Sequence, residues 1–127
     1  MKTTNKSAVV LFAHGSRDPE WAQPFRRIQD AIRLRQPGIQ VELAFLEIME
    51  PTLDHAVSAL ASSGHSTITV APLFMAQGAH LKRDLTRILD AIRADHPKTN
   101  IALLPAIGEV EAIIDAISDW LVVSTTP

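Results

Sequence analysis

Two hydrophobic patterns alternate along the chain. Short, nearly continuous apolar runs are typical of strands that are covered on both faces, and they alternate with longer stretches of helical period. The predicted strands span residues 8–13, 39–46, 67–73 and 100–104. The apolar positions of the four predicted helices are Trp21, Phe25, Ile28 and Ile32; Leu53, Val57 and Leu60; Leu81, Leu85, Ile88 and Ile92; and Val110, Ile113, Ile114, Ile117 and Leu121. This alternation predicts parallel βαβ units.

The turn residues agree with these elements. Asp18 before Pro19 predicts an N-cap with proline at the first helical position, Pro51 is expected to open the second helix, and Gly64 to follow its end. Right-handed crossovers favour a flavodoxin-like, three-layer α/β/α fold with a four-stranded parallel sheet in the order 2-1-3-4. We expect a single domain over residues 1–127, with its core at about 8–123.

Polar side chains stand where the predicted strands end. His14 follows the first strand, Glu47 follows the second, and His80 begins the helix after the third. The carboxyl ends of parallel strands lie at one edge of the sheet, and open α/β sheets bind ligands there beside the switch point, here between strands one and three. The sequence therefore predicts that these three side chains share one site.

Other residues near these positions have more ordinary interpretations. His65 and His96 follow helices, which places them at the opposite, amino end of the sheet as solvent-facing turn residues. Ser16 is not surrounded by the G-x-S-x-G pattern of a nucleophilic serine. Gly15 and Gly78 are either turn formers or points of close approach to a ligand, and the sequence leaves both open.

Composition narrows the classes of function. The formal net charge of -2 gives no reason to expect nucleic acid or an anionic membrane as a partner. The absence of cysteine excludes thiolate metal ligands, so imidazole, carboxylate or amide must hold any metal. Residues 1–7 contain no apolar segment, and we expect them, like residues 124–127, to be a short frayed end of a cytoplasmic protein.

Three segments resemble a known family. They are LFAHGSRDP at 11–19, AFLEIMEPTL at 44–53 and VAPLFMAQGAHLKRDL at 70–85. In this order and spacing they are similar to the class II chelatases of the small CbiX/SirB type, the sirohydrochlorin cobaltochelatases and ferrochelatases. The similarity runs from about Val9 to Asp84. It implies a lyase that inserts a divalent metal into the tetrapyrrole sirohydrochlorin without a nucleotide, and a chelatase-like half domain that works as a homodimer.

The resemblance also implies roles for individual residues. His14 corresponds to the proton acceptor and a metal ligand, His80 to a second metal ligand, and Glu47 to a position that contacts substrate and could carry protons away. The remaining expected substrate contacts are Ser16, Arg17, Met75, Ala76, Gln77, Gly78 and Ala79. Co²⁺ is favoured on family frequency, with Fe²⁺ or Ni²⁺ as alternatives, and the product serves cobalamin or siroheme biosynthesis.

Three rival interpretations remain. A sirohydrochlorin ferrochelatase would share every residue named above, and so would a non-catalytic carrier of metal or tetrapyrrole. A histidine phosphatase is disfavoured because Ala13 stands where that class has a phosphate-binding arginine before the histidine. Turnover of the macrocycle would separate the enzymes from the carrier.

Overall fold

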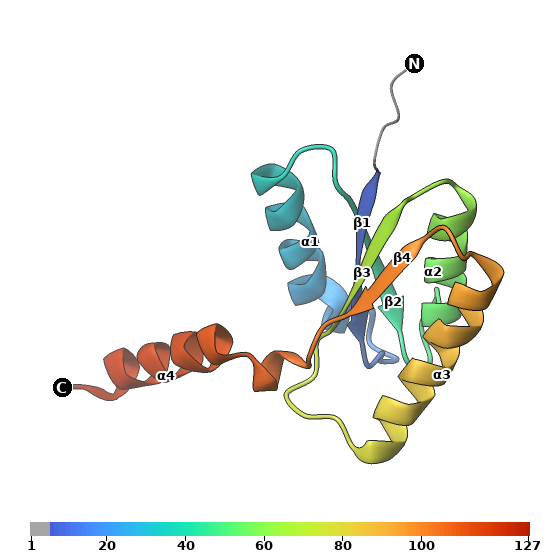
Figure 1. The fold of residues 1–127 in the computed structure, drawn as a ribbon. Helices are drawn as coiled ribbons and strands as arrows, with labels where there is room; N and C mark the ends of the chain where they lie inside the picture. Colours follow the sequence, from blue (N-terminus) through green and yellow to red (C-terminus); the bar gives the residue numbers. More distant parts are fainter. Residues whose placement is uncertain (1–5) are drawn as a thin grey trace.

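A computed structural model describes residues 6–127, so residues 1–5 of the expected leader lie outside the described part of the chain. Strands and helices alternate along it (Figure 1). The strands are β1 (Ser7–Ala13), β2 (Gln40–Phe45), β3 (Thr67–Pro72) and β4 (Asn100–Leu103). The helices are α1 (Gln23–Arg35), α2 (Leu53–Ser62), α3 (Ala79–Asp95) and α4 (Glu111–Thr125), with short 3-10 turns η1 (Pro19–Ala22) and η2 (Ile107–Glu109) before α1 and α4.

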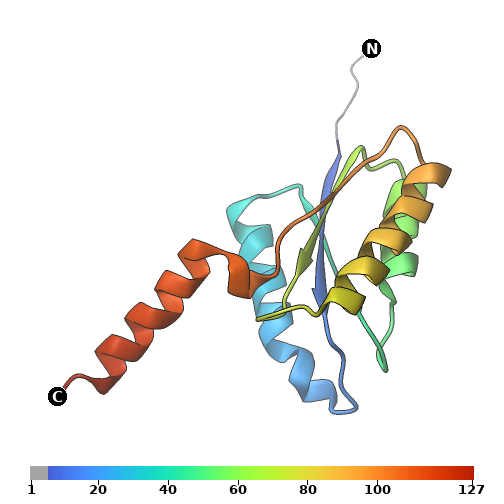
Figure 2. The same cartoon turned by 60° about the horizontal axis from the view of Figure 1, so that its bottom comes forward.

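The four strands form one parallel sheet in the order β2-β1-β3-β4, as predicted. Ala13 at the end of β1 pairs with Phe45 at the end of β2, and Phe12 pairs with Pro72 at the end of β3. The carboxyl ends of these three strands therefore lie side by side. Figure 2 brings this edge of the sheet forward.

Most of the hydrophobic core lies on the face of the sheet that α2 and α3 cover. Its fully buried side chains come from both layers: Val10, Phe12, Ile68 and Val70 from the strands, and Val57, Leu85 and Leu89 from the helices. Helix α1 packs on the other face, against β1 and β2 (Figure 1). This burial of apolar surface fixes the strand ends that carry the candidate site.

Side chains of two helices cover the outer strands of the sheet. Gln29 Nε2 and Arg33 Nη2 on α1 donate hydrogen bonds to the carbonyl oxygen of Val41 in β2, at 2.7 and 3.1 Å. On the other edge, Arg93 of α3 donates to the carbonyl oxygen of Ile101 in β4 through Nε at 3.1 Å and Nη2 at 2.7 Å. These bonds satisfy carbonyl groups that an open edge would leave to water or to another chain.

The predicted helix signals are mostly correct. Asp18 caps η1, since its carboxylate accepts from the backbone N–H of Glu20 at 3.0 Å, with Pro19 at the first position. The expectation that Pro51 opens the second helix is wrong by two residues: α2 begins at Leu53, because the Thr52 hydroxyl caps it by accepting from the N–H of His55.

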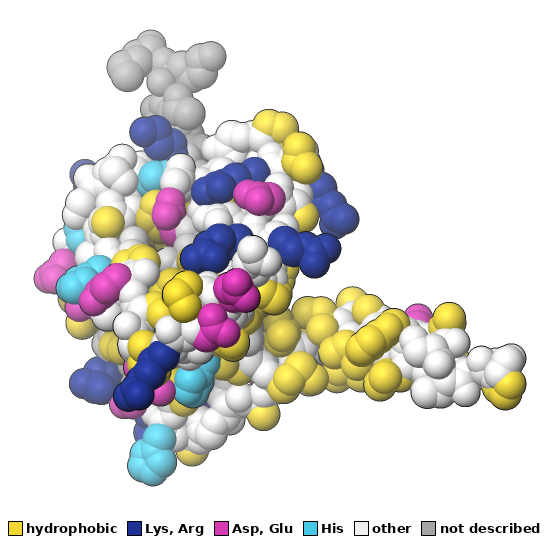
Figure 3. Space-filling view, turned by 180° about the vertical axis from the view of Figure 1, so that it is seen from behind, with side chains coloured by type: hydrophobic (Ala, Val, Ile, Leu, Met, Phe, Trp, Pro, Cys, Tyr) yellow, Lys and Arg dark blue, Asp and Glu magenta, His cyan; other side chains and the backbone are white. Residues whose placement is uncertain are grey.

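Helix α4 does not cover the sheet, although its apolar pattern predicts a helix that packs on a core. It projects away from the body of the molecule in both ribbon views (Figures 1 and 2), and none of its residues is buried by the described part of the chain. Apolar side chains line much of it (Figure 3). The expected frayed tail at 124–127 is partly helical, because α4 continues to Thr125.

Among the helices of residues 6–127, none combines the length and the apolar character that crossing a lipid bilayer requires.

Candidate functional site

His14 and Glu47 are in direct contact at the carboxyl edge of the sheet. The imidazole Nε2 of His14 lies 3.2 Å from Oε1 of Glu47, and each side chain is 57% exposed. The backbone explains their meeting: Leu46 N–H donates to the Ala13 carbonyl at 2.9 Å, and Glu47 N–H donates to the His14 carbonyl at 3.1 Å. The pairing of β1 with β2 thus continues past the ends of both strands and holds the two side chains together.

Gly15 allows this close approach. Its φ of +103° lies in the region that favours glycine, and a Cβ atom built on it would lie 1.9 Å from the carbonyl oxygen of Glu47. A side chain here would push the backbone of Glu47 away from β1. The close approach left open by the sequence is therefore to the neighbouring backbone, whereas a Cβ at Gly78 would meet open space.

The loop between β3 and α3, residues 73–78, reaches the same edge. Leu73 N–H donates to the Phe12 carbonyl at 2.8 Å, which holds the start of the loop beside β1. The Phe74 ring then lies edge-on to two rings of the β1 segment, with centroids 5.4 Å from Phe12 and 6.2 Å from His14. Phe74 is not among the expected site residues, although an aromatic residue shortly after a strand that ends at the site is a usable signal.

Two side chains of this loop bear on ligand binding, one because it is exposed and the other because it has an unpaired acceptor. Met75 is 60% exposed, so it is not a core residue. The Oε1 atom of Gln77 is buried without a hydrogen-bond partner among the described residues. An unpaired buried acceptor costs free energy, and a donor on a bound molecule would remove that cost.

His80 lies in the first turn of α3, exposed, at the far end of the loop. Its Nδ1 lies 3.2 Å from Nη2 of Arg83. A guanidinium only donates hydrogen bonds, so Nδ1 is the acceptor and the lone pair of His80 is engaged by Arg83. Over residues 6–127, no three His, Cys, Asp or Glu side chains group closely enough to hold a metal ion. The structure brings His14 and Glu47 together and leaves His80 outside their contact.

Three further polar side chains lie near these residues: Ser16, Arg17 and Lys82. The Ser16 hydroxyl accepts from the N–H of Asp18 at 3.1 Å, which shapes the turn after His14, and Arg17 is exposed next to it. Lys82 Nζ in α3 lies 3.7 Å from Oε1 of Glu109 in η2. That ion pair is half exposed, so its contribution to stability is small.

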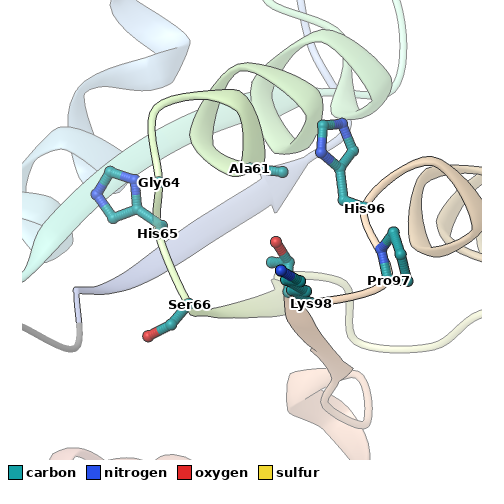
Figure 4. A pocket seen from close by; sticks show the side chains of 8 residues that line it. Ala61, Gly64, His65, Ser66, His96, Pro97 and Lys98 are labelled. Atoms are coloured by element: carbon teal, nitrogen blue, oxygen red, sulfur yellow. The ribbon is translucent and has the colours of Figure 1, made fainter. Parts of the chain in front are cut away.

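His65 and His96 lie at the amino end of the sheet, as predicted. They line a hollow of about 470 Å³ together with Lys98 and neighbouring backbone, on different sides of it (Figure 4). Both are half-buried rather than free in solvent, and His65 Nδ1 lies 3.0 Å from the Leu60 carbonyl oxygen, to which it donates. This hollow is separate from the His14–Glu47 site.

The pair at the carboxyl edge has a defined chemical capacity. A neutral imidazole nitrogen can accept a proton, and the Glu47 carboxylate lies within hydrogen-bond reach of the His14 ring. The same two groups are ligands for divalent transition metals, for which imidazole and carboxylate are common donors. Their exposure leaves both groups accessible to a large substrate.

Known proteins resemble this chain over most of its length. The sirohydrochlorin cobaltochelatase of Sulfurisphaera tokodaii is 36% identical over 111 residues, 87% of this chain and 88% of the relative. Other curated relatives are longer than the matched region: the chain spans 57% of one and 62% of another.

Solved structures share the fold. A cobalamin (vitamin B12) biosynthesis CbiX protein of Marinobacter aquaeolei VT8 superposes with a TM-score of 0.76 at 30% identity, covering 93% of this chain and 96% of that one. The sirohydrochlorin chelatase SirB of Bacillus subtilis subspecies spizizenii, in complex with cobalt, gives 0.73 at 26% identity and covers 91% of this chain but 50% of SirB. Residues 8–122 match the CbiX family, and the chain belongs to it.

Proposed function

We propose that this protein is a sirohydrochlorin cobaltochelatase, a lyase that inserts Co²⁺ into sirohydrochlorin without a nucleotide. The observation that carries the proposal is the exposed His14–Glu47 pair at the carboxyl edge of the sheet. It lies within residues 8–122, which match the CbiX family, and a structural neighbour at 26% identity is in complex with cobalt. The metal is a substrate here, together with the tetrapyrrole.

The reaction requires a base and a ligand at one place. Sirohydrochlorin gives up two pyrrole protons as the divalent metal enters, so the charge of the macrocycle and metal together falls by two. His14 accepts the two protons one after the other, and each time Glu47 stabilises the imidazolium and passes the proton to solvent before the next is taken up. Because both side chains are 57% exposed, protons leave without a buried relay.

His80 is the second metal ligand in this proposal. The Arg83 guanidinium occupies its Nδ1, so metal binding at this atom requires Arg83 to move. Carboxylates of sirohydrochlorin would attract Arg83 and Arg17, since bidentate pairing with a carboxylate is stronger than a bond to neutral imidazole. Substrate binding would then free His80 for the metal.

The loop between β3 and α3, residues 73–78, supplies most of the remaining contacts and is called the substrate loop below. Met75 presents an exposed, flexible apolar side chain that suits the face of a flat macrocycle. The unpaired Oε1 of Gln77 is buried, so Gln77 becomes an acceptor for the substrate when its side chain turns outward. Ala76, Gly78 and Ala79 have little or no side chain, which lets the macrocycle approach the backbone. Ser16 supports the turn that presents His14 and Arg17.

A homodimer completes the site in this proposal. The apolar hollow between α2 and α3 at this edge measures about 170 Å³, too small for a tetrapyrrole, since pockets for drug-sized ligands measure roughly 300–1,000 Å³. SirB, which binds cobalt, is about twice as long as the region that matches this chain. A second copy facing the first would supply the missing wall.

Helix α4 supports the same assembly. Its apolar side chains are exposed, including Trp120 at 66% and Val123 at 76%. On the sheet face that carries α1, alternate residues of β3 are only partly covered: Thr67, Thr69 and Ala71. We infer that α4 of one copy packs on this face of the other, because α4 is apolar, the face is partly exposed, and α4 does not pack on its own sheet.

The test is turnover with sirohydrochlorin and Co²⁺, followed by the absorbance of the macrocycle at low protein-to-substrate ratio. We expect many equivalents of cobalt-sirohydrochlorin per site. A signal that stops at one equivalent supports the carrier instead. Parallel assays with Fe²⁺ and Ni²⁺ compare specificity, and a higher kcat/KM for Fe²⁺ identifies the enzyme as a ferrochelatase.

A further inference from the structure

The turn η2, which precedes the C-terminal helix, makes direct backbone contact with the substrate loop. Gly108 N–H donates to the Phe74 carbonyl at 3.3 Å. A Cβ atom built on Gly108 would lie 1.7 Å from the carbonyl oxygen of Met75, 2.5 Å from its carbonyl carbon and 2.8 Å from its Cα. A methyl group therefore cannot fit unless one of the two backbones moves.

The need for glycine at this position is spatial. Gly108 is not among the glycines with positive φ, so any residue could adopt its backbone conformation. Only the nearness of the Met75 backbone excludes a side chain here. The atoms that would clash belong to backbone, which cannot rotate away as a flexible side chain can. The contact thus sets the distance between two segments that are more than thirty residues apart in sequence.

A second contact joins the same turn to α3. Glu109 Oε1 lies 3.7 Å from Nζ of Lys82, which is in the first turn of α3, where the substrate loop ends. The η2 turn thus touches the loop at Phe74 and Met75 and the helix directly behind it. The loop is supported on one side by β1, through Leu73 and Phe12, and on the other by η2.

We propose that Gly108 is a positioning residue for the chelatase reaction, and that with Glu109 it holds the loop from Phe74 to Gln77 in the position needed for tetrapyrrole binding. The proposed role of Gly108 rests on the proposed function only for the identity of the ligand. Phe74 packs against the ring of His14, so the position of the loop determines where the macrocycle lies relative to the base. Because η2 leads directly into α4, the same turn contacts the substrate loop and sets the start of the helix proposed to form the dimer.

The first experiment reads the loop position without any activity assay. The chain has three methionines, Met1, Met49 and Met75, so methyl-labelled methionine gives three NMR signals, assigned with a Met75→Leu variant. In Gly108→Ala we expect the Met75 signal to shift while the Met49 signal stays. A Gly38→Ala variant is the control for lost stability. Alanine is strained at φ +94°, but a Cβ on Gly38 meets open space, so this variant loses stability without displacing the substrate loop. An unchanged Met75 signal in folded Gly108→Ala overturns the proposal.

The second experiment uses turnover. Misplacing a substrate contact by about 1 Å can cost up to about a hundredfold in rate, so we expect KM for sirohydrochlorin to rise about tenfold in Gly108→Ala. Binding of Co²⁺ alone should change less than KM, since β1 and β2 rather than the loop hold His14 and Glu47. Gly38→Ala should lose stability without a change in KM. Equal KM changes in both variants would mean that lost stability explains the effect, and would overturn the proposal.

A milder variant covers the case in which Gly108→Ala does not fold. Glu109→Gln removes the charge paired with Lys82, and we expect KM for sirohydrochlorin to rise about twofold at low salt and the effect to fade at high salt. Glu111→Gln, two residues on in α4, is the matched control. Identical behaviour of the two variants overturns the proposal. Absence of turnover in the wild-type protein would instead remove the proposed function and leave the NMR result standing.

Discussion

Nε2 of His14 and Oε1 of Glu47 lie 3.2 Å apart because β1 and β2 end in register, Ala13 against Phe45. Two further backbone bonds continue the pairing to the site residues themselves. The pair is thus placed by the hydrogen-bonded sheet, whereas His80 depends on a loop and a helix start. This difference in support leads to different expectations for the two histidines.

The first prediction concerns Glu47. In Glu47→Gln the amide cannot stabilise the imidazolium of His14 by charge. We expect kcat to fall by about 100-fold, the lower end of the roughly 10²- to 10⁴-fold contribution of acid–base catalysis, because His14 itself remains. His14→Ala should fall further. Initial rates of cobalt insertion measure both. Glu42→Gln on the same strand is the control, because Glu42 bonds with Gln40 rather than with His14. Equal rates for wild type and Glu47→Gln would contradict the assigned role.

The second prediction concerns Gly15. Gly15→Ala forces a methyl group against the Glu47 carbonyl and places alanine at φ +103°, so we expect the free energy of unfolding to fall by more than about 2 kcal/mol. Gly38→Ala has a similar φ but no clash, and should cost only about 1 kcal/mol. Urea unfolding measures both. Equal losses would mean that the turn absorbs the methyl group easily.

The third prediction concerns Arg83. Since its guanidinium occupies Nδ1 of His80, Arg83→Gln should free the imidazole and strengthen Co²⁺ binding without tetrapyrrole by a few fold. The same variant should bind sirohydrochlorin more weakly. Calorimetric titration of each ligand measures the two effects. Arg87→Gln serves as control, because Arg87 pairs with Asp84 at 3.0 Å instead. Weaker Co²⁺ binding in Arg83→Gln would contradict the competition.

The sheet order and the site edge could be predicted because both follow from local patterns. Strand periodicity and right-handed crossovers determine the order β2-β1-β3-β4, and the strand exits then place His14 and Glu47 on neighbouring strands. The contact of Gly108 with Met75 could not be predicted. A glycine in a turn has the same local signature whether it provides a dihedral angle or space, and here the required space depends on a loop far away in sequence.

The surface on which α4 packs could not be predicted from the sequence either. Ile113, Ile114, Ile117 and Leu121 form an apolar stripe at helical spacing, which predicts a helix that packs on something. Periodicity does not state whether the packing surface belongs to the same chain or to another. The cap of α2 was misplaced for a simpler reason: proline and threonine are adjacent at 51–52, and both favour a helix start.

The fourth prediction concerns pH. Protons compete with metal for imidazole, so lowering the pH from about 8 to about 5, the range in which histidine changes charge, should weaken Co²⁺ binding. Binding should release protons, and calorimetry in two buffers of different ionisation enthalpy measures how many. His14→Ala should release fewer. Affinity that does not change over this range would contradict imidazole ligation.

The fifth prediction concerns α4 and the proposed homodimer. Leu121 lies on the apolar stripe, whereas Ala112 lies on the opposite side of the helix by its spacing of nine residues, and both are exposed in the single chain. A glutamate at position 121 would be buried against the partner sheet, so Leu121→Glu should shift the mass in light scattering from dimer to monomer. Ala112→Glu adds the same charge and should leave the dimer intact.

Trp120, 66% exposed in the single chain, gives an independent signal in a Trp21→Phe background: its fluorescence should shift to the blue as the protein concentration rises. A wild-type protein that is active and monomeric would contradict the assembly and require the macrocycle to bind on one open sheet edge.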